Sequence, residues 1–242
     1  MSATYVIGDI HGALKALEQL IERIAPGRDD QFIFLGDYVD GWSESAGVVT
    51  YLMALDKKYR CTFIKGNHDA WCESWMLRVM PESSWLMHGG KATIASYEKL
   101  SHEERLRHLA FFNRMLLYHA DEDNRLFVHA GFASMHGPTH DRFAAMCYWD
   151  RTLWELALAV DPRIKRDSRR YPKRLLLFRE IFIGHTPTLN YGEDMPMCAC
   201  NVYNVDTGAA FTGKLSAMNV DTKEVWQSDP VWTLYPEEKG RN

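Results

Sequence analysis

Carboxylate, imidazole and amide side chains recur beside glycine at five places along the chain. The five segments are Gly8-Asp9-Ile10-His11-Gly12, Gly36-Asp37-Tyr38-Val39-Asp40-Gly41, Gly66-Asn67-His68-Asp69, His129-Ala130-Gly131 and Gly184-His185-Thr186. Carboxylate and imidazole ligands together suit Mn²⁺, Fe²⁺ or Zn²⁺ better than Ca²⁺. Asp9 and His11 are two residues apart, so they point the same way in an extended segment. Asp37 could bridge two cations about 3.5–4 Å apart. These residue types indicate a dinuclear metal centre.

Each polar segment follows a run that is typical of a short strand. Strands are expected at residues 4–7, 32–35, 61–64, 126–128 and 181–183, and helices at 13–25, from Ser43 or Ser45 to about 59, and at 70–80. In open α/β sheets, ligands bind at the carboxyl ends of the strands. The alternation of strand and helix therefore predicts an α/β fold that gathers the polar segments. The tail differs, because residues 202–206, 214–220 and 224–226 alternate between turn signals and predict a β-meander.

Composition limits the function further. The chain has 242 residues, of which 46% are hydrophobic, and no linker divides it, so we expect a single domain over residues 1–242. A net charge of −4 gives no support to a nucleic-acid or membrane-surface role. No signal-peptide pattern and no membrane-length apolar run is visible, and five cysteines are an odd number. Reduced thiols and a cytoplasmic location are the expectation. The oligomeric state is not predicted.

The five segments, in this order and each after an expected strand, resemble the motifs of the calcineurin-like metallophosphoesterases. More narrowly, they are similar to the phosphoprotein phosphatase family, and the stretch Asn204-Val205-Asp206-Thr207-Gly208 extends the likeness to its bacterial members. The resemblance implies a sandwich of two mixed β-sheets flanked by helices. It implies one metal on Asp9, His11 and Asp37, and a second on Asp37, Asn67, His129 and His185, with a hydroxide bridging the pair. Mn²⁺ is the expected ion, with Fe or Zn as alternatives.

The same resemblance assigns the catalytic residues. It makes His68 the acid that protonates the leaving group, with Asp40 on its other ring nitrogen. Trp149-Asp150-Arg151 is similar to a W-x-R element of bacterial and phage-type members, which makes Arg151 a phosphate ligand; an ordinary arginine on a helix surface is the alternative. The family also has an arginine directly after the second aspartate of its GDxVDRG motif, and here Gly41 takes that place. The loss should weaken phosphate binding unless another residue substitutes.

Three further segments bear on the site. Residues 163–174 contain seven basic residues, which could steer an anionic substrate toward the cleft or form a solvated loop. Trp71, Trp75 and Trp85 are expected in the core. Gly89-Gly90, with Thr93 and Tyr97, is similar to a GGxxTxxSY element of bacterial family members, and is expected in a loop beside the cleft.

The resemblance favours hydrolysis of phosphomonoesters. The leading expectation is a bacterial-type serine/threonine protein phosphatase that also accepts phosphotyrosine, with a phosphoprotein or a small phosphoester as substrate. Asp69, where the family usually has glutamate, also occurs in bis(5′-nucleosyl)-tetraphosphatases, so a dinucleoside polyphosphate hydrolase is the first alternative. A metal-binding scaffold without catalysis is the second, and the presence of His68 and Asp40 argues against it.

Overall fold

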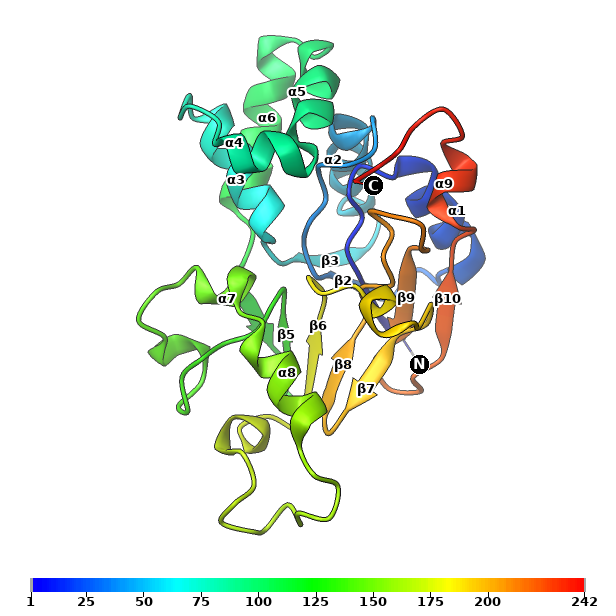
Figure 1. Cartoon of the computed structure of the whole chain (residues 1–242). Helices are drawn as coiled ribbons and strands as arrows, with labels where there is room; N and C mark the ends of the chain where they lie inside the picture. The colour runs from blue at the N-terminus through cyan, green and yellow to red at the C-terminus, as the bar shows by residue number, and fades with distance from the viewer. Residues whose placement is uncertain (1, 242) are drawn as a thin grey trace.

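Ten short strands form two five-stranded mixed sheets in the computed structural model, which describes residues 2–241 (Figure 1). The first sheet has the order β10-β9-β1-β2-β3. It comprises β1 (Thr4–Ile7), β2 (Gln31–Phe34), β3 (Arg60–Phe63), β9 (Ser216–Asn219) and β10 (Val225–Gln227). Strands β1, β2 and β3 are parallel, whereas β9 and β10 add antiparallel to β1. The carboxyl ends of β1 to β3 therefore meet at one edge.

The second sheet has the order β4-β5-β6-β8-β7. Its strands are β4 (Tyr118–Ala120), β5 (Arg125–Val128), β6 (Glu180–Ile183), β7 (Met197–Ala199) and β8 (Val202–Asn204). Strands β5, β6 and β8 are parallel, and β4 and β7 are antiparallel to their neighbours. The predicted sandwich of two mixed β-sheets flanked by helices is confirmed.

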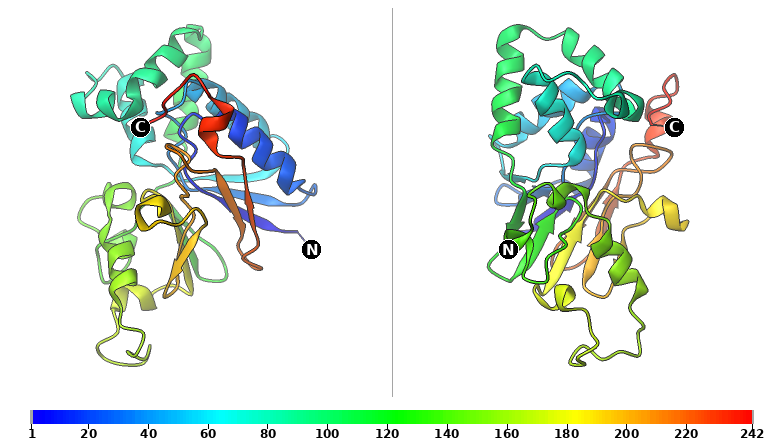
Figure 2. Two further views of the ribbon diagram at one scale, coloured as in Figure 1. Left: turned by 45° about the vertical axis from the view of Figure 1, so that its right-hand side comes forward. Right: turned by 60° about the vertical axis from the view of Figure 1, so that its left-hand side comes forward.

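Helices cover the outer face of each sheet (Figures 1 and 2). The first sheet is covered by α1 (Leu14–Ile24), α2 (Ser45–Leu55), α3 (Asn67–Met76), α5 (Lys91–Glu98), α6 (His102–Asn113) and α9 (Val231–Leu234). Helix α8 (Thr152–Ala159) packs on the second sheet. Short turns complete the chain: α4 (Ser83–Trp85), η1 (Leu86–Gly90), η2 (Pro138–His140), α7 (Met146–Trp149), η3 (Lys173–Leu176) and η4 (Thr188–Tyr191). Among residues 2–241, no helix is long and apolar enough to span a membrane.

The two sheets pack through their inner faces. Apolar side chains from both sheets form one buried cluster there: Val6, Ile33, Leu35, Ile64, Phe127, Phe182, Val205, Met218 and Val220. The rings of Phe127 and Phe182 stack with their centroids 5.0 Å apart. Burial of each such side chain stabilises the fold by about 1.5–3 kcal/mol. This cluster holds the carboxyl ends of the two sets of parallel strands beside each other.

Two details of the sequence prediction were wrong. The expected meander of the tail is divided between the sheets, because β8 pairs parallel with β6, whereas β9 and β10 join β1. The alternating pattern identified strands but contained no information about their partners. The helix expected at 70–80 begins earlier, at Asn67, so Asn67, His68 and Asp69 form its first turn. Their backbone N–H groups therefore lie at a helix N-terminus, which favours anionic groups.

Candidate metal centre and catalytic cleft

Tight turns after β1, β2 and β6 aim the polar side chains into one cleft. The backbone is left-handed at His11 (φ 53°), Asp37 (φ 52°) and His185 (φ 68°), a conformation that non-glycine residues adopt mainly at functional sites. Neighbouring glycines leave room for the carboxylates. A Cβ atom on Gly66 would lie 2.1 Å from Asp37 Oδ1, and a Cβ atom on Gly184 would lie 2.1 Å from Asp9 Oδ1. A side chain at either glycine would displace a carboxylate from the cleft.

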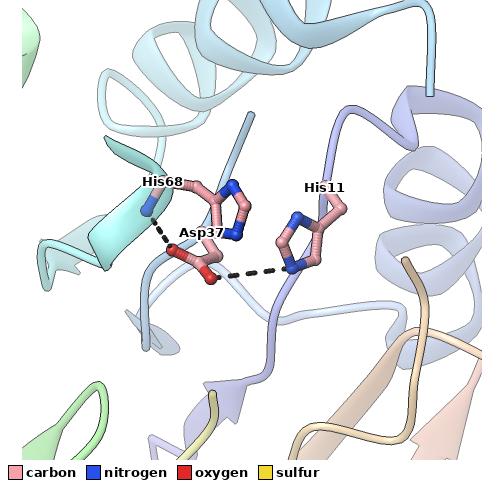
Figure 3. A group of neighbouring side chains, drawn as sticks. All are labelled: His11, Asp37 and His68. Atoms are coloured by element: carbon pink, nitrogen blue, oxygen red, sulfur yellow. Dashed lines mark hydrogen bonds and ion pairs between the residues drawn. The ribbon is translucent and has the colours of Figure 1, made fainter. Parts of the chain in front are cut away.

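His11, Asp37 and His68 form one group of potential metal ligands, drawn in Figure 3. His11 Nδ1 lies 3.0 Å from the Asp40 carbonyl, so this nitrogen carries the proton and Nε2 keeps its lone pair. That Nε2 lies 3.6 Å from Asp37 Oδ2 and 3.9 Å from Asp9 Oδ2. The backbone N–H of His68 donates to Asp37 Oδ1 at 2.9 Å, as the dashed line in Figure 3 shows. Asp37 is thereby held by the His68 backbone and faces the His11 imidazole.

Asp37, His129 and His185 form a second group, so Asp37 is common to both. His129 Nδ1 donates to the Leu35 carbonyl at 2.9 Å, so Nε2 is the nitrogen that could bind a metal once it has lost its proton. Around Nε2 stand Asn67 Oδ1 at 3.1 Å, His185 Nδ1 at 3.2 Å and Asp37 Oδ2 at 3.4 Å. The Nε2 atom of His185 is buried without a hydrogen-bond partner. Lone pairs that converge in this way fit a divalent cation of the Mn²⁺, Fe²⁺ or Zn²⁺ type.

The electrostatics of the cleft favour a positive charge. Burial lowers the pKa of His129, but the Asp37 and Asp9 carboxylates outweigh it and raise that pKa to about 10. A metal ion that binds to Nε2 of His129 must therefore displace a proton from it. Burial lowers the pKa of His11 and of His185 well below the usual range. These two imidazoles are therefore neutral, which is the state that a metal ligand requires.

A buried carboxylate orients His68. Asp40 Oδ2 lies 2.6 Å from His68 Nδ1 and accepts a hydrogen bond from the Trp85 indole at 2.6 Å. Asp40 Oδ1 accepts a hydrogen bond from the Thr93 hydroxyl at 2.6 Å. Asp40 has no exposed surface, so these donors fix its side chain. The His68 ring is held by its Nδ1 atom and can act on a substrate through Nε2.

Asp69 holds the turn that carries Asp37. Its carboxylate accepts hydrogen bonds from the backbone N–H groups of Asp37 at 2.8 Å, Tyr38 at 2.9 Å and Gly66 at 2.8 Å. Asp69 is fully buried, and it supports the position of Asp37 through the backbone. The aspartate therefore joins the loop after β2 to the loop after β3.

A cavity of about 390 Å³ opens beside these groups. Its lining combines residues of the metal centre with aromatic and basic side chains: Asp37, Asn67, His68, Trp71, Ser84, His88, Trp149, Arg151, His185, Pro187, Asn190, Phe211 and Arg241. The rings of Trp71 and Trp149 meet edge to face, with centroids 5.0 Å apart. Arg151 lies at the N-cap of α8, and its Nη1 atom donates to Thr186 Oγ1 at 2.7 Å. The cavity is suited to a ligand that is both aromatic and anionic.

The structure brings together all the residues that the sequence assigned to the site. The six expected ligands, His68 and Asp40 are each at most 7% exposed, and Arg151 lines the cavity. Their assignment to metal and substrate stays a prediction. Trp85 belongs to the core, and Trp71 and Trp75 pack against it, as expected; Trp71 also lines the cavity. The residues of 163–174 precede β6, and none of them lines the cavity in the described chain (Figure 1). Their position supports a solvated loop, except at Arg174, whose guanidinium donates to the Phe132 carbonyl at 2.8 Å and to Thr152 Oγ1 at 2.9 Å.

The sequence did not assign three residues that line the site or contact its side chains: Trp85, Thr93 and Arg241. The roles of Trp85 and Thr93 as donors to Asp40 could not be derived from spacing, because the residues lie 45 and 53 positions away from it. Thr93 had a signal, since it belongs to the segment that resembles GGxxTxxSY. No sequence pattern indicated Arg241, because a single arginine in a charged tail is usually solvated.

The fold and the paired His/Asp groups define a metallohydrolase of the two-sheet α/β class. Residues 3–209 match the model of the calcineurin-like phosphoesterase family, and the chain belongs to this family. The predicted family is confirmed, and the chain is a hydrolase of the metallophosphoesterase class. Members of this family use divalent metals, and the two groups of ligands are consistent with that; they do not identify the ion.

Two sequence relatives cover almost the whole chain. Both are named bis(5′-nucleosyl)-tetraphosphatase PrpE [asymmetrical]. The protein of Oceanobacillus iheyensis is 28% identical over 90% of this chain and 89% of its own, and that of Bacillus cereus is 28% identical over 91% of each. The leading expectation, a serine/threonine protein phosphatase, is not confirmed, because these relatives favour the first alternative.

Solved structures support the fold. A candidate diadenosine tetraphosphatase aligns with a TM-score of 0.65 and 16% identity over 93% of this chain and 92% of its own. A serine/threonine phosphatase from Saccharomyces cerevisiae aligns with a TM-score of 0.58 and 15% identity, covering 94% of this chain and 79% of its own. At these identities the likeness concerns the architecture alone.

Proposed function

We propose that the chain is an asymmetrical bis(5′-nucleosyl)-tetraphosphatase, which cleaves a dinucleoside tetraphosphate into a nucleoside monophosphate and a nucleoside triphosphate. The observation that carries this proposal is the aromatic wall of the cavity. Trp149 is 42% exposed and lines the cavity together with Trp71 and Phe211. Stacking on such a ring contributes about 1–3 kcal/mol per nucleobase. The names of the relatives support the same substrate class.

The ligand assignment is part of the proposal. Two divalent ions, with Mn²⁺ as the first choice, would be held by Asp9, His11 and Asp37 on one side and by Asp37, Asn67, His129 and His185 on the other. When bound, such ions supply a hydroxide at neutral pH and neutralise the charge of the phosphoryl group. Asp37 is the residue that both ions would share, in agreement with its place in both groups of ligands.

The remaining residues of the cleft orient the substrate and move a proton. Arg151 would bind phosphoryl oxygens, because its guanidinium lies beside His185 and Thr186 at the edge of the centre. His68, held by Asp40, would donate a proton from Nε2 to the departing oxygen. A nucleotide is a better leaving group than an alkoxide, since its phosphate is already a weak base. His68 therefore matters less for a dinucleoside substrate than for a phosphoserine.

A substrate panel tests the proposal. With Mn²⁺ bound, we expect kcat/KM for diadenosine tetraphosphate to exceed that for a phosphoserine peptide and for p-nitrophenyl phosphate. The products, separated by ion-exchange chromatography, should be AMP and ATP rather than two molecules of ADP. A higher kcat/KM for the phosphopeptide would overturn the proposal in favour of a protein phosphatase.

The aromatic wall can be tested separately. Trp149→Ala should raise KM for diadenosine tetraphosphate by about tenfold or more, because a stacking surface is lost. It should leave KM for glycerol 2-phosphate, which has no ring to stack, within about threefold. Trp232→Ala is the matched control, since Trp232 is 50% exposed and belongs to α9 rather than to the cavity. An equal change in KM for both substrates would show that the wall does not bind a base.

A further inference from the structure

The family motif has a phosphate-binding arginine at the position of Gly41. In this chain, the side chain of Arg241 lies beside that position. Gly41 has φ 113°, a conformation in which a side chain is strained. A Cβ atom on Gly41 would lie 3.2 Å from Arg241 Cγ and 3.2 Å from the His11 carbonyl oxygen. Arg241 therefore occupies the space that a side chain at position 41 would need.

The segment that carries Arg241 is fixed by specific contacts. In Figures 1 and 2 it runs from α9 back toward α2. Trp42, the residue after Gly41, stacks on Tyr235 with ring centroids 5.2 Å apart. Gly240 lies so close to Trp42 that a Cβ atom there would be 2.7 Å from the ring. The Arg241 N–H donates to the Ala210 carbonyl at 2.9 Å. The two departures from the family motif, Gly41 and Trp42, thus accommodate the same segment.

The Arg241 guanidinium faces the metal centre. Its Nη1 atom lies 3.4 Å from His11 Nε2, the nitrogen whose lone pair is assigned to a metal. Its Cζ atom lies 5.3 Å from the centroid of the Phe211 ring, which restricts the plane of the guanidinium. Its Nε atom is buried and has no hydrogen-bond partner. A cation with an unused donor therefore lines the same cavity as Arg151.

We propose that Arg241 binds the phosphoryl group of the substrate and, with Arg151, completes the phosphate clamp that Gly41 leaves open. This inference rests on the proposed phosphoester hydrolysis, but it holds for a dinucleotide and for a monoester alike. Arg241 and Arg151 approach the cavity from different elements, the segment after α9 and the start of α8. Two guanidinium groups can bind different oxygens of one phosphoryl group, and each contributes charge-assisted hydrogen bonds.

The first test measures phosphate affinity of the Mn²⁺-loaded protein, with inorganic phosphate as the probe. Arg241→Gln should raise both the inhibition constant of phosphate and its calorimetric Kd by about 10–100-fold, because charge-assisted hydrogen bonds are lost. Arg241→Lys should recover only part of the loss, since an ammonium lacks the planar fork. Metal content should remain that of the wild type. Arg28→Gln is the matched control, because Arg28 is exposed in the loop before β2, at the opposite end of that strand.

A second variant moves the arginine without removing its charge. Gly240 has φ 58°, and a Cβ atom there would lie 2.6 Å from the Ala210 carbonyl oxygen, so Gly240→Ala should displace the segment. We expect its phosphate affinity to fall in the same direction as that of Arg241→Gln. Unchanged phosphate affinity in Arg241→Gln would overturn the inference, as would tighter metal binding with no effect on phosphate. A wild-type protein that binds phosphate but hydrolyses none of the panel would contradict only the proposed function.

Discussion

At the scale of single residues, the contacts of His68 distinguish it from the other imidazoles of the cavity. His68 Nδ1 lies 2.6 Å from a buried carboxylate, whereas His88 is exposed and its Nδ1 lies 2.7 Å from the Ser84 carbonyl. An imidazole that is oriented by a carboxylate resembles the usual arrangement of an acid–base catalyst. His88 has no such partner, so its contribution should be limited to contact with the ligand.

His68→Asn should therefore lower kcat in a way that depends on the leaving group. Loss of a positioned acid costs about 10²–10⁴-fold, so we expect a fall of this size with phenyl phosphate. The fall should be much smaller with p-nitrophenyl phosphate, since p-nitrophenolate departs without a proton. The bound metal, measured by atomic emission, should be unchanged. His88→Asn is the control and should keep kcat for both esters. An equal loss with both esters would rule out the acid role.

The hydroxyl of Thr93 should support the same catalytic function indirectly. Thr93→Val keeps the shape of the side chain but removes the donor to Asp40 Oδ1, which should destabilise the fold by about 1.5–3 kcal/mol. Because Asp40 then orients His68 less well, kcat for phenyl phosphate should fall more than kcat for p-nitrophenyl phosphate. Ser96→Ala, one turn further along α5, removes a hydroxyl that accepts from the Ala46 N–H at 3.0 Å. It should change stability alone, as measured by urea unfolding.

At the scale of elements, α5 and α6 carry a titratable group that does not belong to the site. His108 of α6 is 4% exposed, with Nε2 3.1 Å from Thr50 Oγ1 and Nδ1 3.1 Å from the Tyr97 hydroxyl. Burial lowers the pKa of His108 from 6.5 to about 4. The unfolded chain therefore binds more protons than the folded chain between these two values. Stability from this group is complete above pH 6.5 and is lost as the pH falls toward 4.

We expect His108 to make the protein less stable at pH 5 than at pH 7 by about 2 kcal/mol. The measurement is urea unfolding of the metal-free protein at both pH values. His108→Gln keeps hydrogen-bonding groups without the titration, so it should lose less stability over this interval than the wild type. Comparison of the two proteins removes the contribution of the histidines in the candidate metal centre. The same loss in both would mean that His108 does not titrate in this range.

The elements also show which parts of the molecule the sequence could predict. The loops at the ends of β1, β2, β3, β5 and β6 could be predicted, because each combines a short apolar strand with a glycine and a potential metal ligand. In these loops the hydrophobic pattern of the strand and the residue types after it indicate the same position for the site. The partners of β8, β9 and β10 could not be predicted, because strand pairing depends on long-range packing. The place of Arg241 in the site could not be predicted for the same reason, since only the folded chain brings it to 3.4 Å from His11.

At the scale of the whole molecule, the candidate metal centre lies between the two sheets. Asp9 and Asp37 follow strands of the first sheet, whereas His129 and His185 follow strands of the second. The two halves also approach closely at their backbones, since a Cβ atom on Gly8 would lie 2.4 Å from the Val205 carbonyl oxygen. An ion that is bound by ligands of both sheets would therefore act as a link between them, in addition to its role in catalysis.

Metal binding should consequently stabilise the entire fold. At a free Mn²⁺ concentration about 100-fold above Kd, binding to the native state contributes about 2.7 kcal/mol. For a chain of this size that corresponds to a rise in Tm of about 5–10 °C over the chelator-treated protein. His185→Gln removes a ligand of the second sheet and should lose most of the rise, although every residue of the first sheet is retained. His136→Gln, in an exposed loop after β5, is the matched control and should keep the full rise. A wild-type Tm that is the same with Mn²⁺ and with chelator, or a full rise in His185→Gln, would show that no metal joins the two sheets.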